Sequence, residues 1–281
     1  MTGATNDAPG RRTAGERYGE TLFVRDTPEH RRLRLLGEVF DPLSIRTLDA
    51  IGVRPGMRCL EIGAGGGSMA RWLCGRAAPA QVVATDLDIS PLVAQPEENL
   101  LPLVHDVTLD DFPAHSFDLV HARFVLNHLP ERDEVLRRIV RWLRPGGVLV
   151  VESFSWFPVD GSPDAGYRKV LLRWSELLRD TIGTDSRWAR NYPSALAHHG
   201  LRDLGANTVT QHVRGGSDLA DFWRLTVGMS KEQLLGKGYL SAKEYEEFAA
   251  RMRNVDFWDL APALTQAWGR KAWGRKAWGR K

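Results

Sequence analysis

The chain lacks several features that would assign it to a specialised class of protein. Its 281 residues include only two cysteines, Cys59 and Cys74, and their spacing fits neither a disulfide framework nor a metal or redox site. No apolar run approaches the roughly 20 residues of a membrane-spanning helix. The N-terminal residues also lack the apolar core of a signal peptide. These absences predict a cytoplasmic protein in a reducing compartment, without a metal or a membrane partner.

Basic charge is scarce once the C-terminus is set apart. The segment AWGRK occurs three times from Ala267 to Lys281, and the last two copies hold four Lys or Arg and no acid. The whole chain has a formal net charge of +3, so residues 1–271 carry −1. Because no basic stripe remains, we expect no nucleic-acid partner. We interpret the repeated tail 272–281 as a duplication outside the fold, although a nucleic-acid or membrane anchor is an alternative.

The rest of the chain alternates between strand and helix patterns. The apolar spacing predicts strands at about 57–62, 81–86, 101–106, 117–122 and 147–154, with helices at 68–77 and 131–143 between them. Beyond these we expect a helix near 165–182, a strand near 206–213, a helical stretch over 217–258 and a last strand in PALTQAWG. Upstream, the pattern from Leu33 to Ile51 predicts two short helices broken at Pro42. Such alternation indicates a parallel sheet covered by helices, formed by a single domain over 31–271 after a mobile leader, 1–30.

The stretch CLEIGAGGGSMARWL (59–73) places a glycine turn between a strand and a helix. Glycines there let the backbone approach a ligand, and the helix start offers free N–H groups. A dinucleotide is one candidate ligand, but Glu61, two residues before Gly63, would then lie beside the pyrophosphate. A carboxylate suits a positively charged ligand better. S-adenosylmethionine carries a sulfonium and an ammonium group and no phosphate, so it fits the turn.

Two further acids follow the next two predicted strands. Asp86 ends VVATD about 20 residues beyond the glycines, where a carboxylate can accept hydrogen bonds from both ribose hydroxyls. Asp106, in LPLVHDV, is a candidate acceptor for the adenine amino group. Ribose recognition alone would also suit NAD. Both acids are predicted at the carboxyl ends of strands, where open α/β sheets bind their ligands.

Five segments together resemble the class I S-adenosylmethionine-dependent methyltransferases, most closely the small-molecule enzymes of secondary metabolism. They are LEIGAGGGS (60–68), ATDLD (84–88), HDV (105–107), FDLVHARFVLNHLP (117–130) and LRPGGVLVVE (143–152). The resemblance covers roughly residues 35–155. It implies an α/β, Rossmann-like fold whose seven-stranded sheet is mostly parallel, with the last strand antiparallel and helices on both faces.

The resemblance also implies which residues hold the donor, S-adenosyl-L-methionine, which leaves as S-adenosyl-L-homocysteine. These residues are Glu61, Gly63, Ala64 and Gly65 around the methionine part, Asp86 and Leu87 at the ribose and the adenine face, Asp106 and Val107 at the adenine edge, and Ala122 and Arg123 at the methionine end. Arg123 departs from the pattern, because it is a bulky cation near a cationic donor. It either points outward or holds the donor's carboxylate.

Transfer from a sulfonium is an in-line displacement, so positioning alone can supply roughly 7–11 kcal/mol of the barrier reduction and a dedicated base is optional. His128, after the fourth predicted strand, is the candidate base or acceptor contact. The acceptor pocket is expected among aromatic residues outside the shared core, with the candidates Trp156, Trp188, Tyr192, Phe222 and Trp223.

We therefore predict methyl transfer to oxygen or nitrogen of a small, aromatic or polycyclic, natural-product-like acceptor. Three alternatives stay open: carbon methylation of a quinone-like ring, a donor-binding protein of this fold that transfers no methyl group, and an NAD(P) oxidoreductase. The sequence indicates no oligomeric state.

Overall fold

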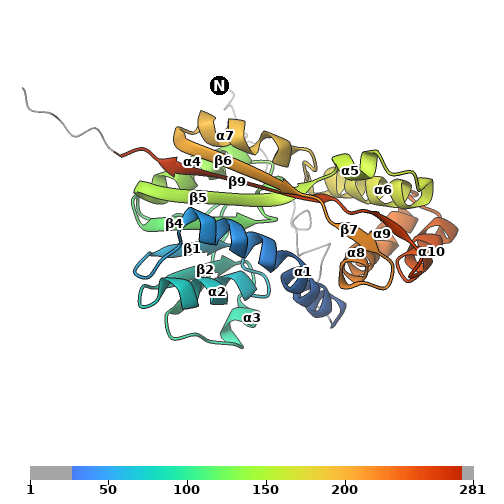
Figure 1. Cartoon of the computed structure of the whole chain (residues 1–281), viewed down its shortest axis with the longest axis horizontal. Helices are drawn as coiled ribbons and strands as arrows, with labels where there is room; N and C mark the ends of the chain where they lie inside the picture. The colour runs from blue at the N-terminus through green and yellow to red at the C-terminus, as the bar shows by residue number, and fades with distance from the viewer. Residues whose placement is uncertain (1–26, 274–281) are drawn as a thin grey trace, which may run out of the picture.

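The computed structural model describes residues 27–273, so the predicted leader lies almost wholly outside the described residues, as does the tail from residue 274 onward. A seven-stranded sheet runs through the molecule (Figure 1). Its strands, in spatial order, are β3 (Leu100–Val104), β2 (Val82–Asp86), β1 (Cys59–Ile62), β4 (Phe117–Arg123), β5 (Leu143–Ser155), β9 (Ala263–Lys271) and β6 (Leu201–Val209). Strand β9 is antiparallel to β5 and to β6, whereas β1 to β5 pair in parallel. The predicted fold class is confirmed.

Helices cover both faces of this sheet. On one face lie α1 (Thr27–Ile51) and α2 (Ser68–Ala77), and on the other lie α4 (Arg132–Trp142) and α7 (Tyr192–His198), as Figure 1 shows. Side chains alternate along each strand, so Leu119 packs with α1 and α2 while its neighbour Val120 packs with α4. The short helix α3 (Ser90–Val93) follows β2.

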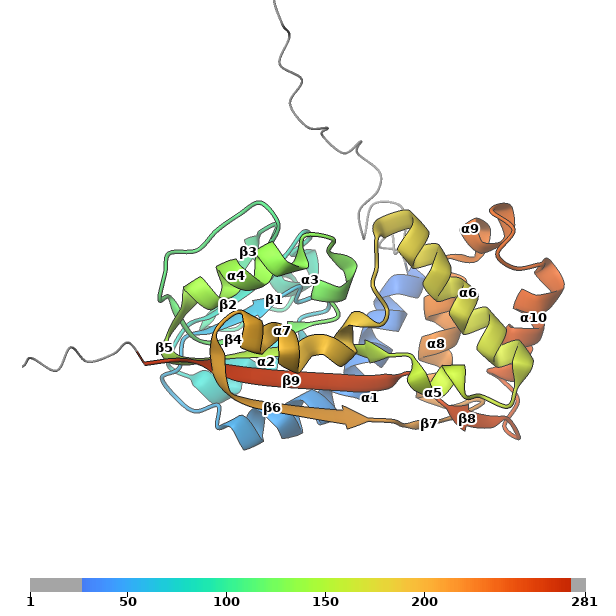
Figure 2. The same cartoon turned by 90° about the horizontal axis from the view of Figure 1, so that it is seen from above.

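A second, mostly helical layer extends beyond the carboxyl ends of β4 and β5 (Figure 2). It consists of α5 (Phe157–Asp160), α6 (Ala165–Ile182), α8 (Asp218–Gly228), α9 (Lys231–Gly236) and α10 (Ala242–Arg251), with a two-stranded sheet of β7 (His212–Arg214) and β8 (Trp258–Leu260). Local signals set the ends of these helices. Asp164 caps α6 by accepting from the Tyr167 amide, and Ser241 with Glu244 forms a capping box at the start of α10.

The prediction of two helices broken at Pro42 is wrong, because α1 is one helix of 25 residues that contains the proline. A proline inside a helix removes one hydrogen bond and crowds the preceding turn. Here tertiary contacts hold the helix on both sides of it: Phe40 packs edge to face on Phe222, and Thr47 donates to Gln266 on β9. Packing therefore overrides the local breaker.

The predicted strand near 206–213 is divided in the structure. Residues 201–209 form β6 in the large sheet, whereas residues 212–214 form β7 in the small one. Its partner β8 is preceded by Phe257, which donates its backbone N–H to Asn254 and accepts from Gly215. The helical prediction for 217–258 holds as three separate helices. The expected last strand is present as β9, and it includes the first AWGRK copy, 267–271.

Candidate functional site

The glycine turn lies between β1 and α2 and requires glycine for two reasons. Gly63 and Gly65 have positive φ angles of 67° and 54°, which L side chains rarely adopt. A Cβ added to Gly63 would lie 2.3 Å from Cγ2 of Val125. The Ala64 amide donates to Thr85 O at 2.9 Å, which ties the turn to β2. The turn is thus a close-fitting backbone cradle at the carboxyl end of the sheet.

The strand-end acids lie at and just beyond the carboxyl ends of β2 and β3. Asp86 is the last residue of β2, and its Oδ2 accepts from the Gly65 amide at 2.8 Å. Asp106 follows β3 by two residues, and its Oδ1 accepts from both the amide and the hydroxyl of Thr108. Each carboxylate oxygen can accept more than one hydrogen bond, so these contacts leave capacity for a ligand. The side chain of Leu87 is half exposed (51%), whereas Val107 and Ala122 are buried in the core on the α4 side.

The sheet register gathers polar side chains on the face covered by α1. Glu61 is the register partner of His121 on β4, and Arg123 is that of Glu152 on β5. Glu152 in turn pairs with Gln266 on β9. Because His121 and Arg123 are two residues apart on one strand, their side chains point to the same face. Five polar residues from four adjacent strands therefore lie together in the interior.

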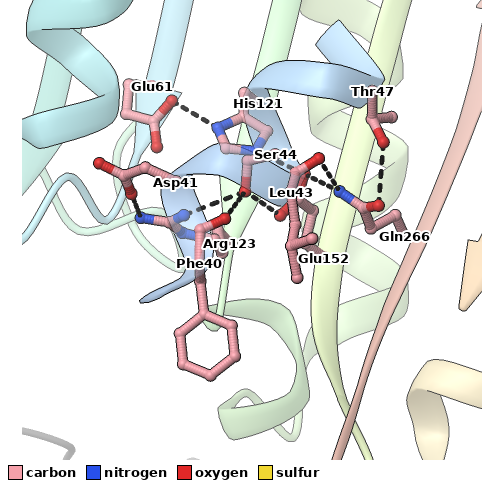
Figure 3. Close-up of polar contacts among 10 residues, drawn as sticks. All are labelled: Phe40, Asp41, Leu43, Ser44, Thr47, Glu61, His121, Arg123, Glu152 and Gln266. Carbon is pink, nitrogen blue, oxygen red and sulfur yellow. Dashed lines mark hydrogen bonds and ion pairs between the residues drawn. The ribbon is translucent and has the colours of Figure 1, made fainter. Parts of the chain in front are cut away.

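His121 lies between two carboxylates in this cluster (Figure 3). Its Nδ1 is 2.6 Å from Oε2 of Glu61, and its Nε2 is 3.3 Å from Oε1 of Glu152. All three side chains are almost completely buried. Burial by itself lowers the pKa of His121, but the two carboxylates more than offset it and raise the pKa to about 10. The imidazole is therefore protonated at neutral pH, and it is the counter-ion of both acids.

Helix α1 closes the cluster from above. Ser44 donates to Glu152 Oε2 at 2.6 Å, and Gln266 donates to Glu152 Oε1 at 2.9 Å (Figure 3). Thr47 donates to the side-chain amide oxygen Oε1 of Gln266 at 2.9 Å. Ionised Glu152 thus accepts hydrogen bonds from a helix and a strand that are far apart in the sequence, and the histidine beside it lowers its pKa against the opposing effect of burial.

Arg123 points into this cluster. Its Nη2 lies 2.7 Å from Oδ1 of Asp41, and its Nη1 donates to Ser44 Oγ at 3.0 Å. The side chain is 6% exposed, so it points inward and not outward. Asp41 of α1 neutralises the cation, which removes the conflict with a positively charged ligand.

A short segment after β4 connects the cradle to a cavity. Phe124 has a left-handed φ of 58°, uncommon for a bulky residue, and its backbone N–H donates to Glu152 O. This sharp turn places Val125 against Gly63 and stacks the Phe124 ring on Phe154 at 4.4 Å between centroids. Val125 therefore contacts the cradle, whereas its neighbour Phe124 lines the cavity.

The cavity lies where β4 and β5 end, between the sheet and the helical layer. It is lined by Arg32, Leu36, Phe124, Asn127, His128, Phe154, Trp156, Trp174, Leu178, Thr184, Ser186, Phe222 and Thr226. Among the described residues, Asn127 Oδ1 and Thr226 Oγ1 are buried without a hydrogen-bond partner. Such atoms are costly to bury, so they indicate a ligand or water that completes their bonding.

His128 lines this cavity but has an unusual proton affinity. Its Nδ1 is 2.9 Å from the hydroxyl of Thr184. Burial, together with the charges of Arg32 and Arg132, lowers the pKa of His128 to about 3. The imidazole is therefore neutral at physiological pH and binds a proton weakly.

The predicted aromatic residues separate into two groups. Trp156 and Phe222 line the cavity, and Trp223 is fully buried behind them, with its ring 5.8 Å from that of Trp156. Trp188 and Tyr192 pack against each other in the core on the α4 and α7 face and are not among the residues that line this cavity. Trp188 begins η2 (Trp188–Asn191), which packs against β5 and β9, and a sequence pattern does not show this packing.

Sequence reasoning missed the residues that α1 contributes, namely Arg32, Leu36, Asp41 and Ser44, and the buried acid Glu152. One signal was present: Glu152 is a charged residue inside an apolar strand pattern, which is rare unless it is paired. Asn127 and Phe124 were also available as neighbours of His128. The sequence pattern did not indicate that α1 contributes to the site, because this contribution depends on how a distant helix docks on the sheet.

The comparisons with known proteins agree with this geometry. A protein-family model described as a methyltransferase domain matches residues 60–151. The ubiquinone/menaquinone biosynthesis C-methyltransferase UbiE of Laribacter hongkongensis is 37% identical over 202 residues, covering 69% of this chain and 79% of the relative.

Two solved structures show the same fold. Phosphoethanolamine N-methyltransferase 2 of Haemonchus contortus, in complex with phosphomonomethylethanolamine and S-adenosylhomocysteine, aligns with a TM-score of 0.56 at 17% identity, covering 89% of this chain and 59% of that one. The [4+2]-cyclase SpnF aligns with a TM-score of 0.53 at 17% identity, covering 84% and 81%. Within residues 27–273, no helix combines the length and the apolar character needed to cross a membrane.

Proposed function

Because the chain belongs to the class I S-adenosylmethionine-dependent methyltransferases, we propose that it methylates a neutral, hydroxylated, flat ring system bound in the cavity between the sheet and the helical layer. The preferred acceptor atom is oxygen, with an uncharged nitrogen as a variant. The observation that carries the proposal is the lining of the cavity: aromatic walls with unsatisfied neutral polar atoms, and no Asp or Glu among the described lining residues.

We assign the donor to the glycine cradle. The cradle fits a ligand that needs close backbone approach, because its glycines place no side chain between the backbone and a ligand. Bound there, S-adenosylmethionine supplies a methyl group already activated on a positively charged sulfur. In this assignment Glu61 faces the ammonium end, Asp86 accepts from the ribose and Asp106 from the adenine edge.

The lining of the cavity argues against a cationic acceptor. Arg32 is buried there and forms a two-point ion pair with Glu29, and His128 stays neutral because of its low pKa. An ammonium group would be buried next to a guanidinium without a carboxylate among the described lining residues, which is unfavourable. A phenolic or enolic hydroxyl, in contrast, can donate to Asn127 Oδ1.

The cavity must widen to take up such a ring. It contains about 50 Å³ of free space. Pockets that bury drug-sized ligands have roughly 300–1,000 Å³. Acceptor binding therefore requires the lining side chains to move apart. Because Trp156 and Trp174 are among them, we expect this movement to change the tryptophan fluorescence of the protein.

We assign His128 a role in orienting the acceptor. A residue with a pKa of about 3 gains little by removing a proton at neutral pH. Its ring is instead held by Thr184 at the cavity wall, next to the unsatisfied Asn127. Since the donor brings its own leaving group, alignment of the acceptor and exclusion of water are the main tasks of the chain.

Carbon methylation of a quinone-like ring is the second candidate. The similarity to UbiE of Laribacter hongkongensis favours it, because that relative is named a C-methyltransferase of ubiquinone and menaquinone biosynthesis. A hydroquinone is also neutral, flat and hydroxylated, so the same cavity suits it. The fold similarity to a [4+2]-cyclase keeps a third candidate, donor binding without methyl transfer. The two buried, free cysteines fit our proposal of a cytoplasmic location.

The test is a transfer assay with methyl-labelled S-adenosylmethionine and four acceptors: 1-naphthol, 1,4-dihydroxynaphthalene, 1-methoxynaphthalene and phosphoethanolamine. We expect label in the hydroxylated compounds and none in the methoxy compound or the amine, and NMR of the product distinguishes O-methyl from C-methyl. Transfer to phosphoethanolamine alone would overturn the proposal. Binding of the donor without transfer to any acceptor would favour the third candidate.

A matched pair of variants tests the role of the cavity. Asn127→Leu removes the unsatisfied acceptor, and we expect transfer to 1-naphthol to fall by about tenfold. Asn207→Leu makes the same change at an exposed position on β6 and should leave transfer unchanged. Equal effects of the two substitutions would contradict the assigned acceptor site.

A further inference from the structure

Three buried ionisable side chains form a continuous row beneath the glycine cradle. His121 lies between Glu61 on β1 and Glu152 on β5, with nitrogen to oxygen distances of 2.6 and 3.3 Å (Figure 3). None of the comparisons or the proposed transfer chemistry accounts for His121. Its ring is completely buried, so it touches neither solvent nor the acceptor cavity. A buried charge of this kind needs a specific reason.

The row has a fixed end at Glu152 and a second end at Glu61, beside the glycine turn. At the fixed end, Glu152 is held by Ser44 from α1 and by Gln266 from β9. At the other end, Glu61 lies two residues before Gly63, and His121 is the side chain that holds its carboxylate. Protonated His121 donates from Nδ1 to Glu61, whereas its Nε2 contacts Glu152 as an ion pair at 3.3 Å without the alignment of a hydrogen bond. The geometry therefore transmits the fixed position of Glu152 through the imidazole to Glu61.

We propose that His121 is a positioning residue for the donor: it clamps the carboxylate of Glu61 in one ionised orientation and so fixes the site that receives the donor's ammonium group. The inference rests on the proposed contact between Glu61 and that ammonium group. His121 itself contacts neither donor nor acceptor.

The charges around His121 support a permanent clamp. The charged groups that face it from the packed elements are Glu61 on β1, Glu152 on β5, Arg123 on β4 and Asp41 on α1. Arg123 and Asp41 neutralise each other at 2.7 Å. With His121 protonated, one imidazolium remains opposite two carboxylates, so the row carries one net negative charge. That charge attracts a donor whose nearest groups are an ammonium and a sulfonium.

Donor fragments separate positioning from a general structural effect. S-adenosylhomocysteine contains the amino-acid part, whereas 5′-methylthioadenosine has the same nucleoside and thioether without it. Calorimetric titration of the full chain with both ligands therefore reports on the ammonium site and the nucleoside site separately. For His121→Gln, we expect the affinity for S-adenosylhomocysteine to fall by about tenfold or more, and that for 5′-methylthioadenosine to change less than about twofold.

Two further variants make the result decisive. Glu61→Gln tests the contact on which the inference rests, and Glu152→Gln loosens the far end of the clamp while both Glu61 and His121 remain. Both should show the same ligand selectivity as His121→Gln, with Glu152→Gln the weaker effect. Tyr167→Phe removes one buried hydrogen bond, to Leu260 O, far from the cradle and serves as the control for general destabilisation.

The outcomes are distinguishable. If Glu61→Gln fails to weaken S-adenosylhomocysteine selectively, the assignment of Glu61 to the donor is wrong. If Glu61→Gln is selective but His121→Gln and Glu152→Gln are not, the donor site stands and the clamp is refuted. Equal losses for both ligands in the His121 and Glu152 variants would make the row merely structural. Should His121→Gln fold poorly, as judged against Tyr167→Phe, Glu152→Gln decides the question.

Discussion

Arg123 Nη2 at the end of β4 lies 2.7 Å from Asp41 Oδ1 on α1, and both side chains are largely buried. The pair joins the sheet to a helix 82 residues earlier in the chain. It also removes the conflict between a strand-end cation and a cationic donor. The same helix lines the acceptor cavity through Arg32 and Leu36. Helix α1 is therefore shared by the two candidate sites.

Removing Asp41 should be costly because it leaves Arg123 buried without its carboxylate. We expect Asp41→Ala to lower the free energy of unfolding by about 3 kcal/mol, measured by urea denaturation. Glu38→Ala breaks an exposed ion pair with Arg34 on the same helix, and should cost no more than about 0.5 kcal/mol. A similar loss in the two variants would show that the buried pair contributes no more to the free energy of unfolding than the exposed pair.

The clamp at His121 should make the free energy of unfolding decrease as the pH rises above neutral. Its pKa is raised in the folded state from 6.5 to about 10, so the stabilisation is complete below about pH 6.5 and is lost as the pH rises toward 10. Between pH 6.5 and 9 the wild-type free energy of unfolding should fall more steeply than that of His121→Gln, by up to about 1.4 kcal/mol per pH unit. Parallel curves in guanidinium denaturation would contradict a protonated His121.

The low pKa of His128 predicts its effect on catalysis. Because its imidazole is neutral above about pH 5, the pH profile of kcat should show no limb from this residue between pH 5 and 8. His128→Gln should raise the KM of the acceptor and reduce kcat by less than about tenfold. A general base would instead lose roughly 10²–10⁴-fold in rate on substitution, so steady-state kinetics decide between orienting and proton removal.

The glycine turn should tolerate no side chain at Gly63. Gly63→Ala places a Cβ at positive φ and against Val125, and we expect it to cost about 1–3 kcal/mol in stability and to weaken donor binding. Gly75→Ala lies in α2 with open space around it, and should stabilise the chain by about 0.5–1 kcal/mol. Thermal unfolding of both variants, with and without S-adenosylhomocysteine, gives the comparison.

Pro42 should be a net cost to α1. Replacing it with alanine restores a helical N–H, and Pro42→Ala should raise the free energy of unfolding by about 1 kcal/mol or more. Pro158 occupies the first turn of α5, where proline is well tolerated, so Pro158→Ala should bring no such gain. A destabilised Pro42→Ala would mean that the proline shapes the helix for its contacts on either side.

The sequence alone determined the features that depend on local spacing. The alternation of apolar patterns predicted the strands of the parallel sheet, and α2 and α6 begin and end where the pattern places them. The glycine turn, Glu61, Asp86 and Asp106 were recognisable because each lies at or just past the end of a strand, and parallel strands end at one edge of a sheet. These are short-range relationships, so they are visible along the chain.

Only the tertiary structure decided the features that depend on distant residues. Packing of Phe40 and the bond from Thr47 to β9 hold α1 continuous through Pro42, against its local preference. The placement of Trp188 on the opposite face of the sheet and the pairing of Arg123 with Asp41 likewise follow from docking. So does the position of His121 between two carboxylates, since its proton affinity comes from burial and neighbours on other strands and not from its own sequence context.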